Sequence, residues 1–168
     1  MTPAPIPTDD DLRLQALHAL LILDTPPEER FDRLVAFIAD EFDVPMALVS
    51  LVDSERQWFK ARIGLDAQQT CRRDSFCGHA LQGPPRVLLV EDALLDPRFC
   101  DNPLVLGPPH IRFYAGAPLV LPGGFVAGTL CVLDTRPRHL DATDLVILAA
   151  VRDLAVAELT RQHDEQPA

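Results

Sequence analysis

Two apolar segments joined by a glycine-rich turn constrain the fold of this chain most strongly. Residues 113–121 and 125–133 are almost entirely apolar or small, and a Pro-Gly-Gly sequence at 122–124 separates them. Glycine adopts the positive φ of tight hairpin turns without steric cost, so the pattern predicts a β-hairpin. Gly116 and Pro118 weaken the first strand as a regular central strand. They indicate a bulge or the close approach of another group at that point.

Apolar side chains at helical spacing predict a helix near each end of the chain. In residues 9–23 leucines recur three and four positions apart, which gives one apolar stripe. The last expected helix begins after Asp141 and runs to about Gln162. Leu140 and Leu145 bracket Asp141 as a hydrophobic staple brackets an N-cap.

A second helix is expected after residue 25. Thr25 and Glu28 have the spacing of a capping box, and Pro26 would occupy the first helical position, where its missing N–H does no harm. Pro45 ends this helix.

Shorter segments complete the predicted order of elements. Strands are expected at 46–52, 57–62 and 86–90, with a polar loop at 66–74 and a short helix capped by Ser75. Hairpin-like strand pairs together with covering helices predict an α+β fold with a largely antiparallel sheet.

One domain accounts for the length of 168 residues, and we expect it to span residues 9–162. Residues 1–8, with three prolines, and residues 163–168 are expected to be flexible tails. The sequence has no apolar run near the roughly 18 residues that span a bilayer and no basic-apolar secretory leader. Four cysteines in such a chain indicate free thiols in a reducing compartment, so a cytoplasmic location with no membrane contact is expected.

The net charge of −10 argues against a nucleic-acid partner, because binding nucleic acid depends on neutralising phosphates. The charge is unevenly spread: between Arg56 and Arg112 eight basic residues face six acidic ones, a local charge of +2 against −12 elsewhere. This segment could attract a small anionic ligand, or its basic residues could pair with neighbouring aspartates.

Several ordered segments resemble the GAF domain family, in the subtype found alone or at the front of bacterial sensor kinases and cyclic-dinucleotide enzymes. The segments are ILDTPPEERFDRL (22–34), ALVSLVDSERQWFKARIGL (47–65), DSFCGHAL (74–81), VEDALLDPRFCDNPLV (90–105), IRFYAGAPL (111–119) and GTLCVLD (128–134).

The resemblance implies a central antiparallel sheet of about six strands. The N- and C-terminal helices would cover one face, and the 66–110 segment would form a pocket on the other. It implies no single cofactor, since members of the family bind cyclic nucleotides, bilins, haem, iron or amino acids, and many have no known ligand. By this analogy, the ligand contacts would come from Phe76, Cys77, His79, Asp92, Arg98, Asn102, Arg112 and Tyr114.

Three chemical alternatives follow from the cysteines. Cys71, Cys77 and His79 are spaced poorly for a zinc site, so no metal is expected. Residues 102–110 have no cysteine for attaching a bilin. A branch of the family reduces free methionine sulfoxide with cysteines. This chain has no thiol at the position of that branch's nucleophilic cysteine. Cys77 lies near the position of another cysteine of that branch, and Cys71 and Cys100 could form a redox relay.

The leading hypothesis is therefore a non-catalytic sensor domain in signal transduction that binds a small ligand. A free methionine sulfoxide reductase and a ligand-free dimerisation module are the alternatives. No kinase, cyclase or DNA-binding segment follows within the sequence, so the signal is expected to pass through a partner protein or a homodimer. The dimer is expected to form through the terminal helices, on the stripes Leu14, Leu17 and Leu21, and Leu148, Ala155 and Leu159.

Overall fold

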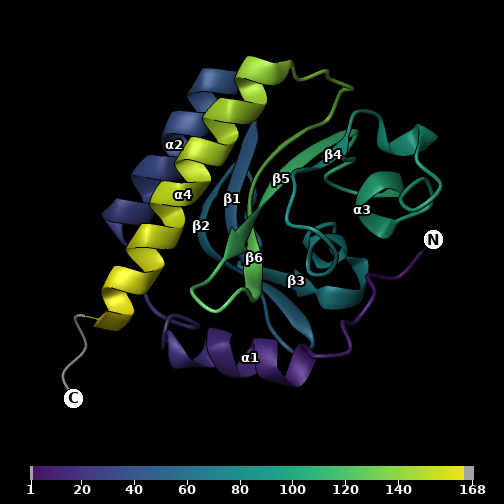
Figure 1. Ribbon diagram of the computed structural model, residues 1–168. Coiled ribbons are helices and arrows are strands. Elements are labelled where there is room, and N and C mark those ends of the chain that lie inside the picture. The colour runs from purple at the N-terminus through teal and green to yellow at the C-terminus, as the bar shows by residue number, and fades with distance from the viewer. Residues whose placement is uncertain (1, 165–168) are drawn as a thin grey trace.

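One antiparallel sheet of six strands forms the centre of the fold (Figure 1). The computed structural model describes residues 2–164, with side chains described through residue 161. The strands are β1 (Met46–Val52), β2 (Arg56–Ile63), β3 (Gln69–Cys71), β4 (Leu88–Val90), β5 (Phe113–Val120) and β6 (Val126–Asp134). Their order in the sheet is β3-β2-β1-β6-β5-β4. The expected α+β fold is confirmed, including the hairpin of β5 and β6, whose turn contains Gly123 and Gly124 at positive φ.

The sheet separates two apolar clusters, because successive side chains of a strand point to opposite faces. Val49, Leu51 and Trp58 belong to the cluster on the helical side. Met46 and Leu48 belong to the cluster on the other side, beneath the loops. Strand β3 lies in the expected polar loop at 66–74. β3 pairs with Arg56–Trp58 of β2, and no apolar pattern in the sequence predicts this strand or its pairing.

Two helices cover one face of the sheet, α2 (Glu29–Phe42) and α4 (Ala142–Asp164), and they run side by side in Figure 1. The predicted cap of α4 is present: Asp144 N donates to Asp141 Oδ1 at 2.8 Å, and Asp141 N donates to Asp144 Oδ2 at 3.0 Å. Residues 163 and 164 of the expected tail continue α4, and residues 165–168 lie outside the described residues.

The predicted capping box at Thr25 and Glu28 is wrong. Helix α2 begins at Glu29 after Glu28, and no side chain caps it. Glu28 instead pairs with the buried Lys60 at 2.6 Å, and Lys60 Nζ also donates to Thr25 Oγ1 at 2.7 Å. A buried ammonium must satisfy its donors, and this requirement takes both predicted capping groups away from the helix.

Helix α1 (Asp10–Ala19) lies across one end of the sheet rather than on the helical face (Figure 1). Arg13 fixes it there, since its guanidinium donates to the carbonyl oxygens of Val52 and Val126 at 2.8 and 3.1 Å. The helix ends four residues before the expected Leu23, and Leu21 adopts a φ of 55° as the chain turns.

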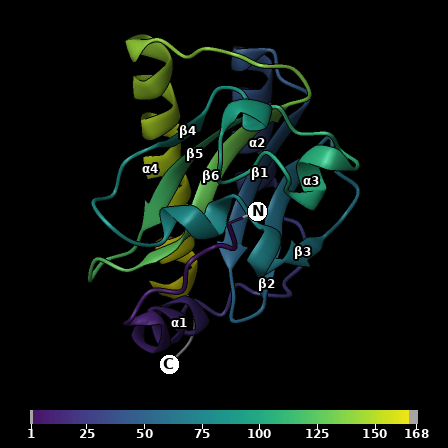
Figure 2. The ribbon, with the colours of Figure 1, turned by 90° about the vertical axis from the view of Figure 1, so that its right-hand side faces the viewer.

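Short elements cover the opposite face of the sheet, the 3₁₀ helices η1 (Arg72–Asp74), η2 (Cys77–Ala80) and η3 (Ala93–Leu95) and helix α3 (Pro103–Leu106) (Figure 2). Ser75 is not the N-cap of η2, since that position belongs to Phe76, but its hydroxyl accepts from Gly78 N within η2 at 3.1 Å. Residues 2–7 also run along this side, where Ala4 N donates to Arg73 O at 3.1 Å. The flexibility expected of residues 1–8 stays a prediction. No helix in the described part of the chain has the length and apolar character needed to cross a bilayer.

Candidate functional site

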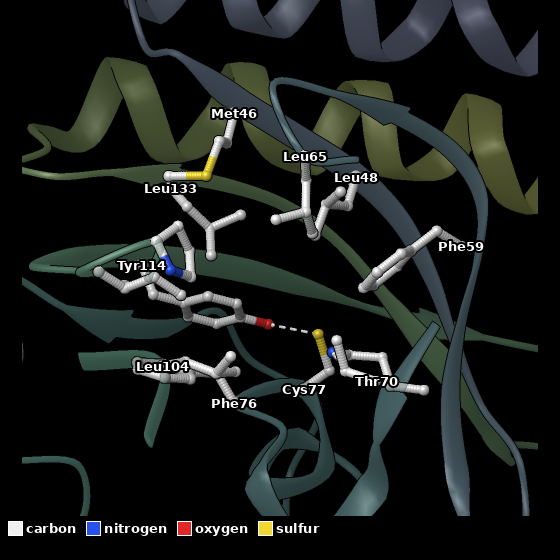
Figure 3. Close-up of a pocket in the computed structure, with 13 residues that line it drawn as sticks. Met46, Leu48, Phe59, Leu65, Thr70, Phe76, Cys77, Leu104, Tyr114 and Leu133 are labelled. Carbon is white, nitrogen blue, oxygen red and sulfur yellow. Dashed lines mark hydrogen bonds between the residues drawn. The ribbon is translucent and has the colours of Figure 1, made fainter. Parts of the chain in front are cut away.

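A small, partly open cavity lies between the loop-covered face of the sheet and the short elements above it (Figure 3). Its volume is about 40 Å³, room for roughly three waters at about 10–15 Å³ each. The lining residues are Met46, Leu48, Gln57, Phe59, Leu65, Thr70, Phe76, Cys77, Leu104, Pro109, Ile111, Tyr114 and Leu133. None of these side chains is cationic, so the cavity offers no partner to an anion and suits a small uncharged molecule.

Strand periodicity places one wall of the cavity. Met46 and Leu48 of β1 are two residues apart, and they share a face of the sheet with Tyr114 of β5. The opposite wall contains Phe76, whose ring stacks on Phe99 with centroids 4.1 Å apart and planes 6° apart. The Phe76 ring also lies 5.2 Å from the Tyr114 ring, so aromatic packing closes the cavity from the loop side.

A buried amide gives this apolar cavity an unused polar group. Gln57 Nε2 donates to Thr70 Oγ1 at 2.8 Å, but the buried Gln57 Oε1 has no hydrogen-bond partner among the described residues. Amide oxygen and nitrogen are assigned from such networks, and either orientation leaves one polar atom without a partner. An unsatisfied buried polar atom costs about 1–3 kcal/mol, so a ligand that hydrogen-bonds Gln57 would recover part of that cost.

A compact polar cluster forms the base of the cavity around Cys77. Tyr114 Oη donates to Cys77 Sγ at 3.1 Å, the bond drawn in Figure 3, and Thr129 Oγ1 donates to the same sulfur at 2.9 Å. The two hydroxyl oxygens are 3.0 Å apart. All three side chains are buried, so these groups satisfy one another rather than water.

The surroundings of Cys77 favour its thiolate. Burial by itself raises the pKa of the Cys77 thiol, but hydrogen bonds from Cys131, Ser50, Thr129 and Tyr114 lower that pKa to about 7. Burial and the neighbouring thiolate raise the pKa values of Tyr114 and Cys131 well above their ordinary range. Cys77 is therefore the group of this cluster that loses its proton first.

Gly116 makes the position of Tyr114 possible. A Cβ at residue 116 would lie 2.2 Å from Tyr114 Oη, closer than two such atoms can approach. Because residues two apart share a face of the strand, the tyrosine ring lies back over the glycine and brings its hydroxyl to Cys77. This is the close approach that a glycine inside the strand indicates.

The family model of the GAF domain matches residues 26–159 of the chain. This protein belongs to the GAF domain family. It is 45% identical over 160 residues to a protein of Pseudomonas aeruginosa named cyclic di-GMP phosphodiesterase. The match covers 95% of this chain and 27% of that protein, so this chain spans about a quarter of the relative's length.

Solved GAF domains share the fold at low sequence identity. The GAF domain of a phosphoenolpyruvate-protein phosphotransferase from Coxiella burnetii superposes with a TM-score of 0.66 at 16% identity, covering 91% of this chain and 95% of that one. A free methionine-R-sulfoxide reductase from Neisseria meningitidis superposes with a TM-score of 0.61 at 17% identity, covering 96% and 98%. These likenesses establish the GAF architecture and no activity.

The GAF domain brings three of the eight predicted contact residues to the cavity, namely Phe76, Cys77 and Tyr114. Their contact with a ligand stays a prediction. His79 lies behind the wall, edge-on to the Phe99 ring at 4.8 Å. Burial and the nearby charge of Arg98 lower the pKa of His79, which therefore favours the neutral imidazole.

Other predicted contact residues have structural partners outside the cavity. Arg98 forms two bonds with the Asp96 carboxylate, at 3.0 and 2.8 Å. Arg112 Nη1 donates to the carbonyl oxygens of Val105 and Ile111 at 2.9 and 3.1 Å. Neither arginine lines the cavity, so neither places a positive charge in it.

Asn102 and Asp92 act as local caps. Asn102 accepts from Leu104 N at 2.8 Å at the start of α3, and its amide donates to Asp74 O at 3.0 Å. Asp92 accepts from Leu94 N at 3.1 Å at the start of η3. Within the described part of the chain, no three His, Cys, Asp or Glu side chains gather as metal ligands would.

Sequence reasoning did not identify Gln57, Thr70, Thr129, Ser50 or Cys131 as part of the site. The available signal was weak: Ser50 and Thr129 are single hydroxyls within otherwise apolar strands, and Gln57 shares its strand face with Phe59. A buried polar residue needs a partner, so such residues indicate a polar cluster without saying where it forms.

Proposed function

We propose that this GAF domain is a non-catalytic sensor that binds a small uncharged molecule in this cavity and signals through a partner protein. The observation that carries the proposal is the unpartnered polar atom of Gln57 in a cavity that no cationic side chain lines. Buried polar groups are normally hydrogen-bonded, and binding sites combine apolar walls with a few such groups that orient the ligand.

This ligand class differs from the anion expected of the basic 56–112 segment. Arg98 and Arg112 have partners elsewhere and do not line the cavity. An anion there would lose its hydration without gaining a cation, which is costly in an apolar site. A neutral ligand with one hydrogen-bonding group avoids that cost.

The proposed signal concerns cyclic di-GMP turnover, in the cytoplasm. Support comes from the Pseudomonas aeruginosa relative, whose name is that of a cyclic di-GMP phosphodiesterase. Cyclic di-GMP carries two phosphates, and no cationic side chain lines the cavity to bind them. In this proposal the dinucleotide level is the output and the cavity ligand is the input. The free thiols of all four cysteines fit a reducing compartment.

Thermal unfolding with a panel of small molecules tests the ligand class. Neutral compounds of a few heavy atoms that carry one hydrogen-bonding group are expected to raise the Tm. A compound at about 100 times its Kd stabilises by about 2.7 kcal/mol, or about 5–10 °C for a domain of this size. Gln57→Leu should lose the ligand-induced shift, whereas Gln82→Leu, at an exposed position, should keep it.

The same panel separates the alternatives. Stabilisation by anions alone would contradict the uncharged ligand. Thiol-dependent reduction of free methionine sulfoxide, lost in Cys77→Ser, would favour the reductase, although the carboxylate of this substrate finds no cationic partner on the cavity wall. A panel without any effect would favour the dimerisation module.

The homodimer stays a proposal, but its interface must be formed by residues other than the expected stripes. Leu17, Leu148, Ala155 and Leu159 of the expected stripes are buried inside the monomer. We propose instead the outer face of α2 and α4, where Phe37, Val146 and Leu154 are 52%, 67% and 56% exposed. Apolar residues gathered on two adjacent helices form a self-complementary surface of the kind that twofold dimers bury.

Sedimentation velocity tests this dimer surface. The wild-type chain should sediment at about twice its mass of 18.5 kDa at micromolar concentration, and Leu154→Glu should sediment as a monomer. Because Leu154 is exposed, the variant should keep its fold, which Trp58 fluorescence can check. A wild-type monomer, or a Leu154→Glu dimer, would exclude this surface.

A further inference from the structure

Two hydroxyl groups donate hydrogen bonds to the buried sulfur of Cys77, those of Tyr114 and Thr129, at 3.1 and 2.9 Å. The Ser50 hydroxyl is fully buried and has no hydrogen-bond partner among the described residues. Together with the Cys131 thiol, it lowers the pKa of Cys77.

These two donors favour a thiolate as their acceptor. The hydroxyls of Tyr114 and Thr129 each have one proton to donate, and a neutral thiol is a weak acceptor, whereas a thiolate accepts several hydrogen bonds. The titratable groups that face Cys77 are Tyr114 of β5 and Cys131 of β6, and both hold their protons more firmly than usual because they are buried beside the thiolate. The arrangement therefore stabilises a thiolate without a cationic neighbour in the cavity.

Access to this sulfur is selective by size. Cys77 is 1% exposed, yet it lines the cavity of about 40 Å³. Small molecules that enter the cavity reach the sulfur, while proteins and bulky thiols do not. Cys71 is exposed and Cys100 partly exposed, so they serve as unselective thiols for comparison.

We propose that Cys77 is a peroxide-reactive thiol and that Cys131 is the second thiol that completes a disulfide with it. The proposal goes beyond ligand sensing, and it stands whether or not the cavity binds another molecule. Cys77 and Cys131 come from different layers, η2 above the cavity and β6 in the centre of the sheet, and both side chains are buried in the apolar cluster beneath the loops. Cys131 lies two residues from Thr129 on the same face of β6, and Thr129 Oγ1 bonds the Cys77 sulfur at 2.9 Å.

The reaction with a hydroperoxide proceeds in two balanced steps. The Cys77 thiolate attacks one peroxide oxygen, the O–O bond breaks, and the leaving alkoxide or hydroxide takes up a proton, which leaves a sulfenic acid on Cys77. Cys131 sulfur then attacks the sulfur of Cys77, and its proton leaves with the sulfenic hydroxyl as water. In sum, two thiols and one hydroperoxide give a disulfide, an alcohol or water, and one further water.

The disulfide would connect redox state to the cavity. Forming it removes the thiolate from the cavity wall and ties η2 to β6, while Tyr114 and Thr129 lose the acceptor that both now share. Two buried hydroxyls that lose a charged acceptor must reorient, so the cavity wall differs between the reduced and oxidised proteins.

The test uses the full chain with Cys71→Ser and Cys100→Ser, which retains only Cys77 and Cys131. Hydrogen peroxide should remove two hydrogen masses from the intact protein, and peptide mapping should find Cys77 joined to Cys131. After the protein is unfolded in denaturant, a dithiol reductant should restore the original mass. The rate should rise with pH to a midpoint near pH 7 and level off above it, because the thiolate is the reactive form.

Two variants make the test decisive. Tyr114→Phe keeps the ring but removes one donor, so the midpoint should move up by about one pH unit. In Cys131→Ser the reaction should stop at a sulfenic acid on Cys77, which intact-mass measurement detects as the gain of one oxygen atom. Trp58 fluorescence checks that each variant is folded. If the retained pair reacts no faster than exposed Cys71 in a variant that retains only that thiol, or forms no internal disulfide, the proposal is overturned.

Discussion

Replacing Gly128 by alanine is expected to destabilise the domain by about 3–5 kcal/mol, a loss at the upper end for a single substitution. Gly128 of β6 lies opposite Leu51 of β1 in the centre of the sheet. A Cβ at residue 128 would lie 1.8 Å from the carbonyl oxygen of Ser50 and 2.8 Å from Leu51 Cα. Both neighbours are backbone atoms, so relief requires opening the pairing of β1 with β6.

Gly123→Ala is the matched control. Gly123 adopts a φ of 102° in the hairpin turn, and a Cβ there would meet no atom within 4 Å. Its substitution should cost about 1–2 kcal/mol, from backbone conformation alone. Urea unfolding followed by the fluorescence of Trp58, the only tryptophan of the chain, measures both variants. A Gly128→Ala cost no greater than that of Gly123→Ala would contradict the packing argument.

The features that sequence predicts correctly are those decided by neighbouring residues. The Pro-Gly-Gly turn and the Asp141 cap depend on residues within a few positions, and both are present. The Thr25 cap fails because Lys60, 35 positions away, takes its hydroxyl as an acceptor. Local chemistry predicts an element only when no distant group competes for it.

The prediction of the site residues from the sequence has the same limit. Phe76, Cys77 and Tyr114 follow from the family resemblance, and all three line the cavity. The sequence left two roles open for the arginines, binding an anionic ligand or pairing with a neighbouring aspartate, and Arg98 pairs with Asp96 two residues away. The meeting of Cys77 with Thr129 joins residues 52 positions apart, so no reading of local pattern could supply it.

Substituting Arg13 by methionine is expected to cost about 3–5 kcal/mol, the range for breaking a buried ion pair by removing one partner. Arg13 is 1% exposed, and its guanidinium bonds Asp10 Oδ1 at 2.8 Å and the carbonyl oxygens that end β1 and begin β6. Methionine fills a similar volume but donates no hydrogen bond. Two buried carbonyls would lose their side-chain donor, and Asp10 would retain Arg72 as its remaining cationic partner.

The pH dependence of this variant supplies an independent check. Burial raises the pKa of Asp10, but hydrogen bonds from Arg72 and Arg13 outweigh it and hold that pKa below its ordinary value. A depressed pKa contributes stability that is complete above the unfolded pKa of about 3.9 and is lost as pH falls through the folded pKa. Arg13→Met should therefore lose this contribution at a higher pH than wild type. Arg33→Met, which breaks an exposed pair with Glu29, should cost less than about 0.5 kcal/mol and leave the acid limb unchanged. Equal costs for the two arginine variants would show that the end of the sheet does not depend on this network.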